Sequence, residues 1–88
     1  MKKQQIDKKQ LAEQLEKYMV NLEDHTYSDE EFHKTKIFIV SILDNKWIRD
    51  RKELAQQLKL VRNSCNIKKH NSLKNHIKLA QGYLQNEN

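Results

Sequence analysis

The sequence predicts an all-α fold, an antiparallel up-down four-helix bundle formed as a single domain over residues 1–88. Apolar residues recur at spacings of three and four in separate stretches, which is typical of amphipathic helices. The chain has no Pro and one Gly, so hairpin and tight-turn signals are almost absent and a β-rich fold is disfavoured. Short connections favour antiparallel neighbours. The predicted helices cover residues 7–23, 28–44, 50–66 and 72–85.

The first helix, over 7–23, has a clear start and a clear apolar face. Asp7 is placed to accept a hydrogen bond as the N-cap. Ile6 before it and Leu11 after it have the spacing of a hydrophobic staple. The predicted inner face consists of Leu11, Leu15, Tyr18, Met19 and Leu22.

The second helix, over 28–44, carries the clearest local signal in the chain. Ser28 and Glu31 have the spacing of a capping box, and Tyr27 and Phe32 have that of a staple. The run over 37–43 is apolar around most of the helix, so we expect this helix to be the central one. We expect it to end at Asp44 and Asn45, followed by Trp47 and Ile48 as core residues in or near the connection.

The last two helices are predicted from apolar residues that recur at spacings of three and four. Helix 50–66 starts near Asp50, with Glu53 as its cap partner, and its end frays between Arg62 and Lys69. Helix 72–85 follows Asn71 or Ser72 as its N-cap. The predicted inward residues are Leu54, Leu58, Val61 and Cys65 on one helix and Leu73, Ile77, Ala80 and Leu84 on the other, with Tyr83 at the edge.

The net charge of +5 is carried entirely by the C-terminal part of the chain. Up to Glu53, basic and acidic residues are equal in number. Beyond it, the only acid is Glu87, against Lys59, Arg62, Lys68, Lys69, Lys74 and Lys78. A neutral half joined to a basic half indicates a binding module whose partner surface is anionic.

The residues that catalysis or metal binding requires are not arranged for either. The four histidines lack the spacing of a zinc or di-iron site, and the single glycine excludes a Gly-rich phosphate loop. We therefore predict a protein that is not an enzyme and binds no cofactor or metal. Cys65 has no partner for an internal disulfide, which fits a reducing cytoplasm. No apolar run is long enough to span a bilayer, and the charged start is not that of a signal peptide.

One alternative is a small phage or plasmid regulator that binds DNA through a degenerate helix-turn-helix at 51–69. Ala55 would be its small invariant residue and Cys65 an inward residue of the recognition helix. The expected apolar positions are Leu54, Leu58 and Leu60. Lys59 stands where the turn normally has Gly, and Lys68 falls at the next inward position. Such a regulator should dimerise and bind duplex DNA with a steep salt dependence.

Over its full length, the chain resembles the small cytosolic immunity proteins of pediocin-like and lactococcin-type bacteriocins. The resemblance lies in the opening Met1–Ile6, in Ser28–Glu31 and Leu43–Asn45 at the two ends of the second helix, and in the aromatic-containing connection that follows. The order of a charged, an apolar, a basic and a short helix is also similar.

The resemblance implies a cytoplasmic, non-enzymatic four-helix bundle that protects the producing cell from inside. Family members associate with the membrane components of the mannose phosphotransferase system once bacteriocin has engaged them, at the inner membrane surface. Recognition is attributed to the C-terminal half, and we expect a monomer. Carried over to this chain, the partner-binding residues are Lys59, Arg62, Lys68, Lys69, Lys74, Lys78 and Tyr83.

Overall fold

The computed structural model describes residues 5–86, and over these residues the chain is all-helical, with five helices and no strand. The predicted all-α class is confirmed. Residues 1–4, which belong to the resemblance, and Glu87 lie outside the described residues. The helices are α1 (Lys8–Asp24), α2 (Asp29–Ile42), α3 (Lys46–Arg49), α4 (Lys52–Asn66) and α5 (His70–Gln85).

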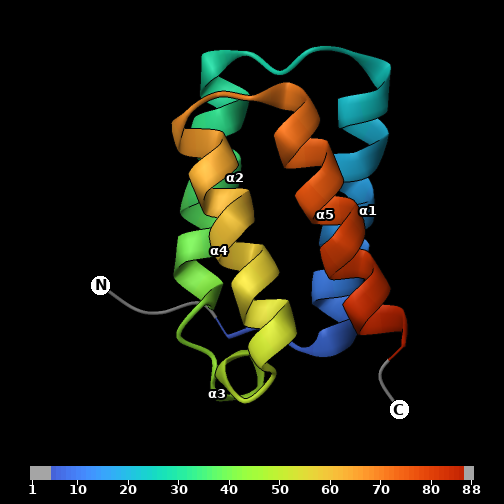
Figure 1. The fold of residues 1–88 in the computed structure, drawn as a ribbon, viewed down its shortest axis with the longest axis vertical. Helices are drawn as coiled ribbons and strands as arrows, with labels where there is room; N and C mark the ends of the chain where they lie inside the picture. Colours follow the sequence, from blue (N-terminus) through green and yellow to red (C-terminus); the bar gives the residue numbers. More distant parts are fainter. Residues whose placement is uncertain (1–4, 87–88) are drawn as a thin grey trace.

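The four long helices lie side by side, and α4 and α5 form the most extensive pair (Figure 1). α4 also packs against α2, and α5 also packs against α1. The connection after α1 and the connection after α4 lie at the same end of the molecule, whereas α3 lies at the opposite end (Figure 1). None of the described helices has the length and apolar character that crossing a membrane requires.

One continuous core fills the space between these helices. Tyr18 is only partly buried, and its ring packs edge-to-face on that of Phe38 at a centroid distance of 5.9 Å, which joins α1 to α2. The other predicted inward residues are confirmed as buried. They are Leu11, Leu15, Met19 and Leu22 on α1, Leu54, Leu58, Val61 and Cys65 on α4, and Leu73, Ile77, Ala80 and Leu84 on α5.

The two helix starts predicted from local signals are confirmed. At α1, the Gln10 N–H donates to Asp7 Oδ1 at 2.8 Å, and the Asp7 N–H donates to the Gln10 side chain at 3.0 Å. At α2, Ser28 and Glu31 exchange the equivalent bonds at 3.3 and 2.9 Å. These reciprocal bonds satisfy backbone donors that the first turn of a helix leaves free.

The connection after α2 differs from the prediction. α2 ends at Ile42 rather than at residue 44, and Trp47 and Ile48 belong to the short helix α3. The cause is Asn45, which is buried and donates to the Ile42 carbonyl from both its backbone N–H and its side chain, at 3.0 and 2.9 Å. Ile48 is fully buried, so its assignment to the core is confirmed.

The last two helices also start elsewhere than predicted. α4 begins at Lys52, and the predicted cap of Asp50 with Glu53 is wrong, because Arg51 is the N-cap residue and makes no side-chain cap bond. α5 begins at His70 rather than after Asn71 or Ser72. The sequence gives no cap signal at either position, because neither N-cap side chain accepts a bond.

The expectation that the second helix is central is wrong. Ile37 is 54% exposed and Val40 is 47% exposed, so part of the apolar run faces outward. α4 and α5 each pack against two other long helices, whereas α2 packs mainly against α4.

Candidate partner-binding surface

The seven predicted partner-binding residues occupy three separate regions rather than one face. Two lie on α4, three at the end of the molecule that holds the α4–α5 connection, and two on the second half of α5. They are Lys59 and Arg62, then Lys68, Lys69 and Lys74, then Lys78 and Tyr83.

Lys59 and Arg62 lie on the side of α4 that faces away from α5. Gln57 and Ser64 mark the α5-facing side, because they hydrogen-bond to α5 side chains at 2.9 and 2.7 Å. A rotation of about 100° per residue places both cations at least about 140° around the helix from those two residues. Lys59 is exposed and Arg62 partly exposed, and neither forms an ion pair with a described residue.

The basic residues at the α4–α5 connection are partly neutralised by acids from the N-terminal half. Lys68 Nζ lies 3.2 Å from Asp29 Oδ2, and Lys74 Nζ lies 4.0 Å from Glu23 Oε2. Exposed pairs of this kind contribute at most about 1 kcal/mol, but they reduce the positive field. Lys69 has no such pair within residues 5–86.

Lys78 and Tyr83 are on the part of α5 that lies far from the α4–α5 connection. Tyr83 is 40% exposed and borders a shallow hollow that it shares with residues 50–54. Lys78 lines a second hollow with Leu79 and Gly82, also beside Tyr83. An exposed tyrosine in such a place offers an apolar ring with a polar tip to a partner.

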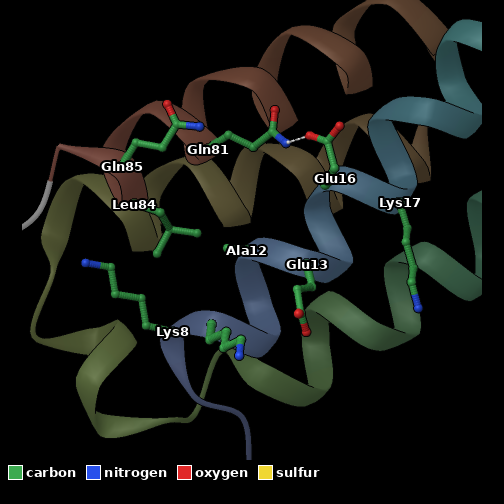
Figure 2. A pocket seen from close by; sticks show the side chains of 9 residues that line it. Lys8, Ala12, Glu13, Glu16, Lys17, Gln81, Leu84 and Gln85 are labelled. Carbon is green, nitrogen blue, oxygen red and sulfur yellow. Dashed lines mark hydrogen bonds between the residues drawn. The ribbon is translucent and has the colours of Figure 1, made fainter.

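A surface groove runs between α1 and α5, and no predicted site residue lines it (Figure 2). Glu16 and Gln81 face each other across it and hydrogen-bond at 3.0 Å, whereas Glu13 and Lys17 extend away from α5 (Figure 2). Its lining mixes lysines, glutamates and glutamines, so it selects no single ligand charge. The helices that form it come from opposite ends of the chain, which is why sequence reasoning missed it.

The described histidines and the cysteine are not arranged as a metal or nucleophile site. Residues 5–86 contain no group of three or more His, Cys, Asp or Glu side chains placed to hold a metal ion. Burial raises the pKa of Cys65 to about 12, so the thiolate that nucleophilic chemistry needs does not form near neutral pH. His76 is engaged with Gln57 at 2.9 Å.

The helix-turn-helix alternative is contradicted by the geometry of α4. Residues 52–66 form one uninterrupted helix that passes through Lys59, where the turn would have to lie. A recognition helix set at an angle to a first helix is therefore not formed within 51–69.

No protein-family model, curated protein or solved structure matches this chain.

Proposed function

We propose that this chain is a bacteriocin immunity protein that is not an enzyme and protects its cell from the inside. In this proposal it binds the bacteriocin-engaged membrane components of the mannose phosphotransferase system at the inner membrane surface. The observation that carries the proposal is that Lys59, Arg62, Lys69 and Lys78 form no ion pair with any described residue. Their charge is free to meet an anionic partner.

The position of such a protein at a membrane surface follows from electrostatics. The cytoplasmic leaflet is negatively charged and attracts basic segments by about 1 kcal/mol per Lys or Arg near the surface. Four unpaired cations would increase the rate of encounter with a receptor embedded there, and local contacts such as that of Tyr83 would prolong the complex.

We also propose that the four long helices form an up-down antiparallel bundle, with α3 inserted in the second connection. The packing of α1 with α5, α5 with α4 and α4 with α2 supports this arrangement, as does the place of the two loops at one end (Figure 1). This is the architecture that the resemblance implies.

A protection assay tests the proposed function. The chain is expressed in a bacteriocin-sensitive lactic acid bacterium, which is then challenged with purified pediocin-like and lactococcin-type peptides. We expect resistance to one peptide or to a related few. Sensitivity to all of them, with the protein soluble and helical in the cell extract, would contradict the proposal.

Two charge variants separate the unpaired cations from the paired ones. Replacing Lys59, Arg62, Lys69 and Lys78 with Gln should restore sensitivity. The matched control replaces Lys68 and Lys74, which already face acids, and should keep most of the protection. Equal protection by both variants would remove the unpaired cations from the mechanism.

A further inference from the structure

Gly82 is the one glycine of the chain, and it lies within α5 without a positive φ. Beyond its own stretch of the helix, a Cβ added there would meet no atom of residues 5–86 within 4 Å. Neither the backbone conformation nor the internal packing therefore requires glycine, which is less stable in a helix than alanine. A missing side chain has a use where another molecule approaches the backbone closely. The position thus indicates a contact outside the chain.

The side of α5 that holds Gly82 faces away from the other helices. Gln81 hydrogen-bonds to α1 at 3.0 Å (Figure 2), and His76 hydrogen-bonds to α4 at 2.9 Å. With a rotation of about 100° per residue, Gly82 lies about 100° from Gln81 and about 120° from His76. It lies about 160° from the buried Leu84. The two described helices that pack against α5 therefore leave this side uncovered.

Four residues on this side form a hole of the kind that accepts a side chain from a facing helix. Leu79, Gly82, Tyr83 and Asn86 stand at i, i+3, i+4 and i+7, so they share one stripe of α5. All four line one hollow. Leu79 is 49% exposed and Tyr83 is 40% exposed, so the hole has apolar walls, and the missing side chain of Gly82 leaves its floor open.

The charge of this surface is positive. Lys78 is the charged residue of the hollow, and it is exposed and forms no ion pair with a described residue. α5 contains no acidic residue. The neighbouring hollow beside Tyr83 is lined by residues 50–54, in which cations and acids are equal in number. The surface therefore complements a partner that carries a carboxylate opposite Lys78.

We infer that the Gly82 hole, formed by Leu79, Gly82, Tyr83 and Asn86, docks a helix of a partner protein that presents a large aliphatic side chain beside a carboxylate. The inference rests on the proposed binding role and gives the chemistry of the partner. The aliphatic side chain would enter the hole above Gly82, as knobs enter holes between other packed helices. The carboxylate would pair with Lys78 at the edge of the hole.

Other occupants fit the Gly82 hole less well. Two copies of a chain with a net charge of +5 repel each other. A bilayer is fluid and adapts its surface to any side chain, so a missing Cβ gives it no advantage. Binding to nucleic acid depends on several phosphate contacts, whereas Lys78 is the one cation of the hollow. A rigid helix benefits from both the open floor and the single cation.

The probe for a direct test is a synthetic peptide of about 18 residues, roughly five helical turns, with Leu along one face and Glu beside it. A scrambled peptide of the same composition is the control, and binding to the whole chain is followed by amide NMR shifts. We expect shifts confined to residues 75–86 and 50–54. No binding of the Leu and Glu peptide, equal binding of the scrambled peptide, or shifts on another face would overturn the inference.

Filling the hole separates binding from stability. Gly82→Leu should weaken binding of the peptide by about tenfold. Its thermal midpoint should not fall, because leucine is the better helix former and the space around Gly82 is open. The matched control, Ala12→Leu, adds bulk at an exposed position of α1 and should bind as tightly as the parent chain. A Gly82→Leu variant that is folded and binds equally well would show that the hole is not the docking site.

The charge contact is tested by reversal. Lys78→Glu should weaken binding of the peptide with Glu by about tenfold, and it should strengthen binding of a peptide with Lys in place of Glu. Lys9→Glu makes the same change of charge on α1, outside the hole, and should leave both affinities nearly unchanged. Equal effects of the two variants would mean that net charge alone matters, which contradicts a contact at Lys78.

The same NMR measurement distinguishes the other occupants. Shifts of residues 75–86 that appear with vesicles of phosphatidylcholine and phosphatidylglycerol, with a DNA duplex, or with rising concentration of the chain alone, but not with the peptide, would overturn the inference. The assay contains neither bacteriocin nor receptor. A chain that protects cells without binding the peptide would contradict only this inference, and a chain that binds the peptide without protecting cells would contradict only the proposed function.

Discussion

At the scale of single residues, Asn45 fixes both the end of α2 and the position of the segment that precedes α1. Its side-chain oxygen accepts a hydrogen bond from the Ile6 N–H at 3.3 Å, while its amide nitrogen donates to the Ile42 carbonyl at 2.9 Å. Trp47 Nε1 donates to the Ile6 carbonyl at 2.7 Å. Residues near the start of the chain are thus anchored to the α2–α4 connection.

Replacing Asn45 with Ala should destabilise the fold by about 1–3 kcal/mol, because it leaves the buried Ile6 N–H without its acceptor. The thermal midpoint should fall by about 4–8 °C for each kcal/mol in a domain of this size. Thermal melts followed by circular dichroism measure this change. Asn75→Ala, at an exposed position of α5, is the control and should be nearly neutral.

Phe32 is a second residue whose replacement should lower the stability of the fold. It is 4% exposed and lies edge-to-face with Tyr27 at 5.6 Å, as the staple predicted. Phe32→Ala should reduce the free energy of unfolding by about 3–5 kcal/mol, through lost apolar burial and the cavity that remains. Urea denaturation gives this value, and a loss below about 1 kcal/mol would show that the staple does not stabilise α2.

At the scale of the helices, local chemistry decided which boundaries were predictable. Asp7 with Gln10 and Ser28 with Glu31 form capping bonds within one turn of helix. Both helix starts could therefore be predicted from the spacing of these residues. The end of α2 depends on Asn45, whose acceptor contact with Ile6 spans 39 residues. α3 and α5 begin without a side-chain cap bond. The sequence therefore contains no capping motif from which these two helix starts could be predicted.

Gly82 offers a prediction within α5. It is helical, and a Cβ added there would have no atom within 4 Å. Gly82→Ala should therefore raise the free energy of unfolding by about 1 kcal/mol, the usual difference in helix propensity. Urea denaturation of both chains checks this, and a loss of stability would mean that the space around Gly82 is filled in solution.

The connection between α1 and α2 should respond to pH through His25. Its Nε2 lies 2.7 Å from Glu31 Oε2 and its Nδ1 lies 3.3 Å from Asp24 Oδ2. The Glu31 hydrogen bond, followed by the Asp24 bond, raises the pKa of His25 above 6.5. Backbone bonding at Ser28, followed by the His25 bond, lowers the pKa of Glu31 below 4.5.

The sign of the pH effect follows from these two directions. A raised histidine pKa stabilises the fold fully below 6.5 and loses this effect as the pH rises through the folded value. A lowered carboxyl pKa stabilises above 4.5 and loses its effect as the pH falls through its folded value. The stability difference between the parent chain and His25→Gln should thus be largest between pH 4.5 and 6.5 and disappear in alkaline solution. Melts across pH measure it, with His33→Gln as the control, and a difference that grows above neutral pH would contradict it.

At the scale of the whole molecule, the fold redistributes the charge that the sequence concentrates in its C-terminal part. The sequence shows which residues are cations, but it does not show which acidic side chains lie next to them in the fold. Folding brings Asp29 to Lys68 and Glu23 to Lys74, whereas Lys59 and Arg62 form no ion pair with a described residue. The single C-terminal face expected from the sequence is thus divided. Which acids lie beside which cations depends on helix packing, which residue spacing alone does not specify.

The four unpaired cations should contribute little to the stability of the fold. Replacing Lys59, Arg62, Lys69 and Lys78 with Gln removes no ion pair with a described residue and reduces the repulsion within a chain of net charge +5. At low salt, the thermal midpoint should stay constant or rise. Any rise should vanish near 1 M salt, where charges are screened within about 3 Å. A fall of several degrees would mean that these side chains are structural, and the argument that their charge is kept for a partner would lose its basis. An unchanged midpoint together with lost protection would separate stability from binding in one variant.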